Sequence, residues 1–270
     1  MDLKNPRVMG IINLTPDSFY RASRTLDIGN VVDRVGAMIE DGADMIDLGA
    51  ASTRPGSISP SVTEEIDRIT GPLMAIRAAF PDLFISIDTF RSEVLKSCLD
   101  ARINLVNDIS AGSLDAKFLE TVAESRLPYV LMHMQGNPRS MQENPEYEDV
   151  VLDIVKRLDR QIHLCQEIGI AELIVDPGFG FGKSVSDNYR LLANLSSLKI
   201  FDFPILVGLS RKSMIYKPLD SKPENALNGT TALHMIALQN GASILRVHDV
   251  KPAKECIKLW TLLKEETSAF

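Results

Sequence analysis

The strongest constraint on the fold of this chain is a repeated alternation of short apolar runs with longer amphipathic segments. The runs have the length of buried strands, and the segments between them carry apolar residues at helical spacing. No internal repeat, low-complexity tract or linker interrupts the pattern. About eight runs occur, which favours a (β/α)8 TIM barrel over a doubly wound open sheet. The predicted strands are 8–13, 45–48, 83–87, 104–106, 129–132, 173–175, 205–207 and 244–247.

Length and composition agree with one α/β barrel domain over residues 1–270. The chain has 270 residues, 45% of them hydrophobic, and barrels of this class have roughly 250. A net charge of −7 argues against a nucleic-acid surface, and no run of about 18 apolar residues predicts a membrane span. The first six residues have no apolar leader region, and the three cysteines have no paired spacing, so we expect a cytoplasmic protein.

Local signals support the predicted helices. Ser61 and Glu64 have the spacing of a capping box, and Gly42, Gly169 and Gly241 each follow a helical segment. The apolar positions expected to pack inward include Val31, Val35, Met38 and Ile39, then Ile66, Ile69, Leu73, Met74 and Ile76, and later Leu152, Val155, Leu158, Ile162 and Cys165.

Side chains that are suited to catalysis or binding gather just after the predicted strands. In a barrel these strand ends form one mouth, which is where barrel enzymes place their active sites. The segments before the strands read as plain polar turns. The residues at the predicted mouth are Asn13, Thr53, Arg54, Asp88, Asn107, Asp108, His133, Asp176, Ser210, Arg211, Lys212, Arg246 and His248.

One group at this mouth alternates hydrogen-bond donors and acceptors. Asp88 and Asp176 end apolar runs, where an unpaired carboxylate is costly, so each needs donors. One Asp on its own would fit a structural salt bridge with Lys212. Two carboxylates together with Asn107 and a lysine fit instead a flat heterocycle that has ring N–H, amino and carbonyl groups. His133 reads instead as a hydrogen-bonded structural residue.

A second group is suited to an anion. Strand alternation places Arg246 and His248 on one face, and Thr53 with Arg54 adds a hydroxyl and a second guanidinium. An ion pair between Arg246 and a nearby acid is the alternative reading. Asn13 offers a carbonyl oxygen that, together with phosphate oxygens, fits Mg²⁺.

The glycine-rich stretch at 173–184 ends a predicted strand and resembles a phosphate loop. It lacks the Walker spacing, because three residues instead of four separate Gly178 from the Gly-Lys-Ser end, and Pro177 has no N–H. The dinucleotide pattern fails as well. We therefore expect a tight turn after Asp176 that brings Phe181 and Lys183 to the edge of the mouth.

Eight short motifs run in order from the first predicted strand to the last. They are MGIINLTPDSF at 9–19, STRPG at 52–56, SIDT at 86–89, NDI at 107–109, MHMQG at 132–136, DPGFGFGK at 176–183, SRK at 210–212 and RVHDV at 246–250. Taken together, these motifs resemble those of the dihydropteroate synthases.

The resemblance implies a (β/α)8 enzyme, expected to be a homodimer, that joins 6-hydroxymethyl-7,8-dihydropterin diphosphate to 4-aminobenzoate with Mg²⁺. It implies an SN1-like displacement of diphosphate, and it makes the chain a candidate target of sulfonamides, which imitate 4-aminobenzoate. Catalytic roles fall to Asp88, Asp176, Lys212 and Arg246; pterin binding to Asp88, Asn107, Ile109, Asp176 and Lys212; diphosphate binding to Asn13, Thr53, Arg54, Arg246 and His248; 4-aminobenzoate binding to Thr53, Pro55, Phe181, Lys212 and Ser213; and the metal to Asn13.

Two departures from the family pattern keep other functions open. Tyr20-Arg21-Ala22-Ser23-Arg24 stands where the family usually has Ser-Asp-Gly-Gly, and Ala50 and Ala51 stand where it usually has two glycines. A non-catalytic pterin-binding paralogue and a pterin-dependent methyltransferase are the alternatives.

Overall fold

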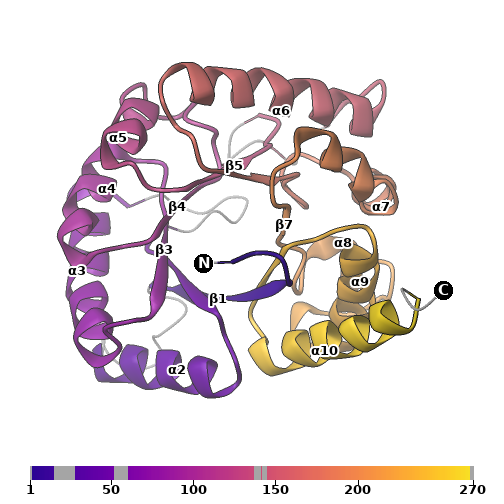
Figure 1. The fold of residues 1–270 in the computed structure, drawn as a ribbon, viewed down its shortest axis with the longest axis horizontal. Helices are drawn as coiled ribbons and strands as arrows, with labels where there is room; N and C mark the ends of the chain where they lie inside the picture. The colour runs from indigo at the N-terminus through magenta and orange to yellow at the C-terminus, as the bar shows by residue number, and fades with distance from the viewer. Residues whose placement is uncertain (1, 15–27, 52–59, 137–140, 142–144, 268–270) are drawn as a thin grey trace.

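The eight predicted strands form a ring of parallel strands. In this computed structural model the described residues are 2–14, 28–51, 60–136, 141 and 145–267. Within them, one eight-stranded sheet has the order β6-β5-β4-β3-β2-β1-β8-β7, and a parallel bridge from Val175 to Ile205 joins its two ends. Helices surround the strands (Figure 1). The (β/α)8 barrel prediction is confirmed.

The observed strands agree with the predicted ones within one or two residues at their ends. They are β1 (Arg7–Asn13), β2 (Met45–Gly49), β3 (Phe84–Asp88), β4 (Leu105–Asp108), β5 (Tyr129–Met132), β6 (Leu173–Asp176), β7 (Leu206–Val207) and β8 (Ile244–Val247). The α-helices are α2 (Ile28–Glu40), α3 (Val62–Ala79), α4 (Ser92–Cys98), α5 (Phe118–Ser125), α6 (Val150–Glu167), α7 (Val185–Ala193), α8 (Ser213–Tyr216), α9 (Leu227–Gln239) and α10 (Val250–Thr267). Short 3-10 helices are η1 (Leu99–Ala101), η2 (Leu195–Phe201) and η3 (Pro223–Asn225).

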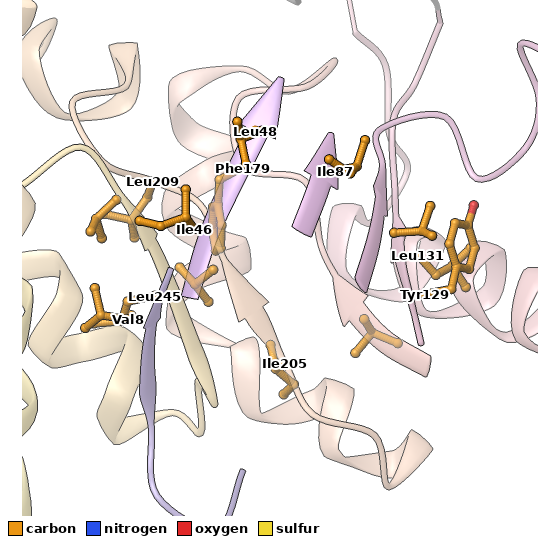
Figure 2. Packing of buried hydrophobic residues seen from close by; sticks show 14 of the residues in the cluster. Val8, Ile46, Leu48, Ile87, Tyr129, Leu131, Phe179, Ile205, Leu209 and Leu245 are labelled. Atoms are coloured by element: carbon orange, nitrogen blue, oxygen red, sulfur yellow. The ribbon is translucent and has the colours of Figure 1, made fainter. Parts of the chain in front are cut away.

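Strand alternation divides the barrel into two separate apolar cores. One face of each strand packs outward against the helices, as Val8, Ile46, Ile87, Leu131 and Leu245 do in Figure 2. Burying each such side chain contributes about 1.5–3 kcal/mol. The opposite face fills the inside of the barrel with a second cluster near the amino ends of the strands: Met9, Met45, Leu105, Val130, Ile174, Leu206 and Ile244.

The helix signals are confirmed, with two errors in the predicted apolar faces. Ser61 and Glu64 form the capping box of α3. Met74 is 54% exposed and Leu152 is 50% exposed, although both were expected to pack inward. A helix turns about 100° per residue, so Met74 is rotated away from the buried Leu73, and Leu152 lies nearly opposite the buried Val150.

All three cysteines of the chain are buried. Cys98, Cys165 and Cys256 are free thiols. Among the described helices, none combines the length and the apolar character that a membrane span requires.

A buried arginine joins two loops at the end of the barrel where the strands begin. Arg77 is only 8% exposed, and its guanidinium donates to loop carbonyls that connect α3 to β3 and η1 to β4. Its acceptors are the carbonyl oxygens of Leu83 (2.7 Å), Pro81 (2.8 Å), Ala101 (2.9 Å) and Arg102 (2.9 Å), with Asn104 Oδ1 at 3.2 Å. One side chain therefore supplies hydrogen-bond donors to both loops.

We predict that Arg77→Ala lowers the free energy of unfolding by about 2–4 kcal/mol, because several buried carbonyls lose a charged donor. Urea denaturation of the purified protein measures the change. Arg160→Ala, which removes an exposed arginine from α6, is the matched control and should change stability by less than about 0.5 kcal/mol. An equal, small effect for both variants would contradict the structural role of Arg77.

Candidate functional site

The inside of the barrel becomes polar above the apolar layer. Advancing two residues along a strand keeps the side chain on the interior face, so Met45 is followed by Asp47, Leu105 by Asn107, Ile174 by Asp176 and Ile244 by Arg246. Asp88, at the end of β3, lies on the same face. The barrel thus brings together the carboxylates, amide and cation that the sequence placed after separate strands.

Arg246 lies between two carboxylates at the centre of this polar layer. Its Nε is 2.7 Å from Asp47 Oδ2, and its Nη2 is 2.6 Å from Asp88 Oδ2. The Asp47 side chain is fully buried, while those of Asp88 and Arg246 are 13% and 18% exposed. The structure therefore agrees with the alternative prediction, in which Arg246 forms an ion pair with a nearby acid. Asp47 was missed as a site residue, although a carboxylate inside an apolar run was a visible signal.

Burial and neighbouring charges shift the acid–base behaviour of this cluster. Burial raises the pKa of Asp88 to about 7, with Arg246 opposing the shift and Asp47 adding to it. Burial acts to lower the pKa of Arg246, but Asp47 and Asp88 outweigh it and hold that pKa above its ordinary value. Arg246 is thus a permanent cation, whereas Asp88 exchanges a proton near neutral pH.

Asp176 and Lys212 face the same space from β6 and the loop after β7. Asp176 accepts a 2.7 Å hydrogen bond from the Gly178 N–H, and the Lys212 ammonium donates to the Phe179 carbonyl. Burial raises the pKa of Asp176, with Lys212 opposing the rise, and burial lowers the pKa of Lys212 to about 8. Asp176 thus supplies a hydrogen-bond acceptor and Lys212 a donor, and burial moves the pKa values of both groups toward neutral pH.

Lys212 also marks the place where the predicted 4-aminobenzoate residues meet. Its Nζ lies 4.6 Å from the centre of the Phe181 ring, a cation–π contact. Ser213, the next residue, is the first of helix α8. The structure therefore places Phe181, Lys212 and Ser213 next to one another.

Asn107 adds an amide to the polar layer, and three buried apolar side chains lie outside both core clusters. Asn107 Nδ2 donates to Asp47 Oδ2 at 2.9 Å. Ile109 follows β4 and is 4% exposed. Ile11, Ile109 and Met132 are buried, but none belongs to either apolar core cluster.

The glycine-rich turn after Asp176 has the tight geometry that the sequence predicted. Gly178, Gly180 and Gly182 have positive φ angles of 69°, 81° and 63°. A Cβ on Gly178 would lie 1.9 Å from the His133 carbonyl oxygen, so only glycine fits.

The expectation that Lys183 lines the edge of the mouth was wrong. Lys183 is 2% exposed, and its ammonium donates to the carbonyls of Gly178 (2.8 Å) and Phe181 (3.0 Å) and contacts His133 Nδ1 (3.1 Å). Loop carbonyls need a donor when buried, which draws the lysine under the turn. His133 is only half satisfied, because its buried Nε2 has no partner among the described residues.

On the diphosphate side of the predicted site, His248 is oriented by Ser210. Ser210 Oγ accepts from the His248 backbone N–H at 3.3 Å and lies 3.1 Å from its Nδ1. If the serine hydroxyl donates its one proton to Nδ1, the ring proton lies on Nε2. Burial, together with Arg246, lowers the pKa of His248 to about 4, so the ring is uncharged at neutral pH.

The loops that carry these residues are tied together. Arg211 makes a two-bond ion pair with Asp249, with Nε–Oδ2 at 2.7 Å and Nη2–Oδ1 at 2.9 Å. Since Arg211 precedes Lys212 and Asp249 follows His248, this pair fixes the β7 loop relative to the β8 loop.

Of the remaining predicted site residues, Asn13 is among the described residues and the others are not. Asn13 ends β1, is half-buried, and pairs in register with Gly49, which pairs with Asp88. Thr53, Arg54 and Pro55 lie outside the described residues, as does the divergent segment 20–24. Within the described ranges, no three His, Cys, Asp or Glu side chains are grouped as a metal site.

Comparison with known proteins identifies the family. The pattern described as "Pterin binding enzyme" matches residues 9–248. The chain is 44% identical over 261 residues to the dihydropteroate synthase of Escherichia coli K12, covering 96% of this chain and 92% of that protein.

Two solved structures bear on the site. The Xanthomonas albilineans dihydropteroate synthase with 4-aminobenzoic acid has a TM-score of 0.91 and 38% identity, covering 98% of this chain and 95% of that one. The same enzyme in complex with 7,8-dihydropteroate has a TM-score of 0.87 and 37% identity, with coverage of 98% and 95%. With a barrel interior that unites Asp88, Asn107, Asp176, Lys212 and Arg246, the chain belongs to the dihydropteroate synthases of the pterin-binding enzyme family.

Proposed function

We propose that this protein condenses 6-hydroxymethyl-7,8-dihydropterin diphosphate with 4-aminobenzoate to give 7,8-dihydropteroate and diphosphate. The observation that carries the proposal is the polar layer inside the barrel, where three carboxylates, an amide and two cations converge above an apolar floor. A relative of 38% identity is known with 4-aminobenzoic acid, and the same enzyme with 7,8-dihydropteroate.

The pterin ring is assigned to the deeper half of this layer. Asp88 and Asp176 accept from ring N–H and amino groups, Asn107 adds an amide, and Lys212 donates to the ring carbonyl. Ile109 supplies a buried apolar wall. Because these groups are already oriented by hydrogen bonds, the ring binds without a large ordering cost.

The reaction begins with loss of diphosphate from the 6-methylene carbon. The C–O bond breaks as charge grows on the leaving oxygen, and Arg246 with the Nε2–H of His248 stabilises that charge, joined in our assignment by Thr53 and Arg54. The electron-rich ring delocalises the positive charge left on carbon, and Asp88 and Asp176 favour it electrostatically. The arylamine nitrogen then forms the C–N bond and releases one proton to solvent.

The described side chains favour this dissociative path over a covalent enzyme intermediate. Burial raises the pKa of Cys98 to about 11 and that of Cys165 to about 12, so both remain neutral thiols. Ser210 does lie beside a histidine, but His248 has a pKa of about 4 and is too weak a base to activate a hydroxyl at neutral pH.

We assign Mg²⁺ to Asn13 and the diphosphate. Mg²⁺ commonly binds through one or two protein oxygens and substrate phosphates, which agrees with a half-buried amide at a strand end and with the absence of a carboxylate cage among the described residues. When bound, the ion neutralises negative charge on the leaving group.

The second substrate, 4-aminobenzoate, is assigned to the outer edge of the mouth. The Phe181 ring gives its arene an apolar surface, Lys212 lies over that ring, and Ser213 follows Lys212 as the first residue of α8. Thr53 and Pro55 are assigned to the same pocket from the resemblance. This position leaves the amine facing the methylene carbon of the bound pterin.

We further propose a single-domain cytoplasmic homodimer. Three buried, unpaired cysteines suit a reducing compartment. Ile236 on α9 and Leu259 and Leu262 on α10 are 46%, 59% and 52% exposed, and the two helices lie side by side in Figure 1. Exposed apolar side chains on neighbouring helices favour a subunit contact, and analytical ultracentrifugation measures the assembly directly.

The test of the function is diphosphate release from the dihydropterin diphosphate with Mg²⁺, measured with and without 4-aminobenzoate. We expect 4-aminobenzoate-dependent release. Lys212→Ala should lower kcat/KM by about 100-fold or more, since it removes a buried charge partner of Asp176. Lys217→Ala, an exposed neighbour, should retain near-native kinetics.

The outcome also separates the alternatives. Pterin binding without 4-aminobenzoate-dependent release would support the non-catalytic paralogue. Methyl transfer from a methylated tetrahydrofolate in place of diphosphate release would support the methyltransferase.

Pterin affinity should be greatest between about pH 7 and 8. The carboxylate form of Asp88 accepts from the ring, so affinity falls as the pH drops through its pKa of about 7. The ammonium form of Lys212 is the stronger donor, so affinity falls again as the pH rises through about 8. Titration calorimetry with the dihydropterin alcohol, which lacks the ionising diphosphate, measures this profile. In Asp88→Asn, the fall in pterin affinity at low pH should disappear. If the variant keeps the fall seen in the wild type, another group causes it.

Asn13→Ala should raise the Mg²⁺ concentration required for half-maximal turnover by about tenfold, because one metal oxygen ligand is lost. Affinity for the dihydropterin alcohol should be unchanged, since that ligand carries no phosphate. Kinetics across a Mg²⁺ series and calorimetry measure the two effects. An unchanged Mg²⁺ requirement would remove Asn13 from the metal site.

A further inference from the structure

Asp47 is a buried carboxylate to which neither the family motifs nor the proposed reaction gives a role. It lies in the middle of β2, between Met45 in the apolar floor and Gly49 at the mouth, and its side chain is fully buried. Placing an ionised carboxylate in such a position costs several kcal/mol unless donors meet it. The identity of its donors therefore indicates its purpose.

A single oxygen of Asp47 joins two strands that do not touch each other. Its Oδ2 accepts from Arg246 Nε on β8 at 2.7 Å and from Asn107 Nδ2 on β4 at 2.9 Å. In the barrel order, β4 and β8 each lie two strands away from β2, on opposite sides. Asp47 thus connects the residue assigned to the pterin amide contact with the residue assigned to the diphosphate.

The contact with Asn107 determines which end of its amide faces the ligand. A carboxylate only accepts hydrogen bonds, so the amide must turn its Nδ2 toward Asp47. Its Oδ1 then points away and is available as an acceptor for a ring N–H or amino group. Without Asp47, the amide is free to rotate by about 180° and to present a donor where the ring also presents one.

The contact with Arg246 gives the guanidinium a fixed anchor. Asp47 and Asp88 hold two different nitrogens of the same group. When a pterin donor engages Asp88, that carboxylate is shared between ring and arginine, whereas Asp47 remains committed to Arg246. The guanidinium then keeps its position for the leaving group.

We propose that Asp47 is a positioning residue that orients Asn107 for pterin recognition and anchors Arg246 for diphosphate departure, an inference that rests on the proposed function. It couples the two halves of the site through one carboxylate. A purely structural role, in which Asp47 only balances the charge of Arg246, is the competing explanation.

The test compares Asp47→Ala with Asp44→Ala. Asp44 is a matched control because its carboxylate likewise joins two side chains that are distant in sequence, Arg7 (3.1 Å) and Lys254 (2.8 Å), but it lies before β2 at the opposite end of the barrel. Thermal denaturation, affinity for the dihydropterin alcohol and the kinetics of diphosphate release are measured for each. We expect Asp44→Ala to lower the melting temperature while affinity and kcat/KM stay within about twofold of wild type.

Asp47→Ala should lower the affinity for the dihydropterin alcohol by about tenfold, because Asn107 is no longer oriented. It should also lower kcat by about tenfold, because Arg246 is no longer anchored. Asp47→Asn, which keeps the shape if the alanine variant fails to fold, should lower kcat more than pterin affinity, because the anchor loses its charge. In a double-mutant cycle, Asn107→Ala should cost little additional affinity when Asp47 is already alanine.

Additive losses in that cycle, or near-native pterin affinity in folded Asp47→Ala, would overturn the proposal. These outcomes are separable from failure of the proposed function. If wild type binds the dihydropterin alcohol but releases no diphosphate, the reaction assignment fails while the Asn107 part of the Asp47 test still proceeds. If wild type binds no pterin, both are overturned.

Discussion

The interior of this barrel depends on one guanidinium shared between two buried carboxylates. Arg246 holds Asp47 and Asp88 at 2.7 Å and 2.6 Å, and the three residues come from β8, β2 and β3. Neither carboxylate is stable in this position alone, and the arginine would be equally unfavourable without them. The charges therefore specify one another, and they fix the centre around which Asn107 and the other polar groups are arranged.

The scaffold makes such a cluster possible by separating two tasks along β2, β4, β6 and β8. Residues near the amino ends of these strands fill the barrel with an apolar layer, and residues two positions further on carry polar groups. The outward faces supply the larger core against the helices. Stability is thus provided below and around the site, and the polar layer is free to be shaped by ligand chemistry. The tight glycine turn, with Lys183 beneath it, then brings Phe179 and Phe181 to Lys212.

Most of the site was predictable because most of its polar residues lie at or just after the carboxyl ends of apolar strands. Asp88, Asn107, Asp176 and Arg246 all meet inside the barrel, as that rule requires. Asp47 escaped prediction because it lies within a strand instead of at its end. Lys183 was misplaced because adjacency to the mouth in sequence does not reveal that buried carbonyls draw its ammonium inward.

The sequence by itself determined the barrel, its strands and the side of the sheet that carries the chemistry. Those features follow from hydrophobic periodicity and strand alternation, which are local properties of the chain. Only the tertiary structure decided the partners: which acid meets Arg246, which way the Asn107 amide faces, and which hydroxyl lies beside the His248 ring. Such pairings join residues as far apart as Asp47 and Arg246, and they depend on the ring closure that brings strands two places apart across one interior.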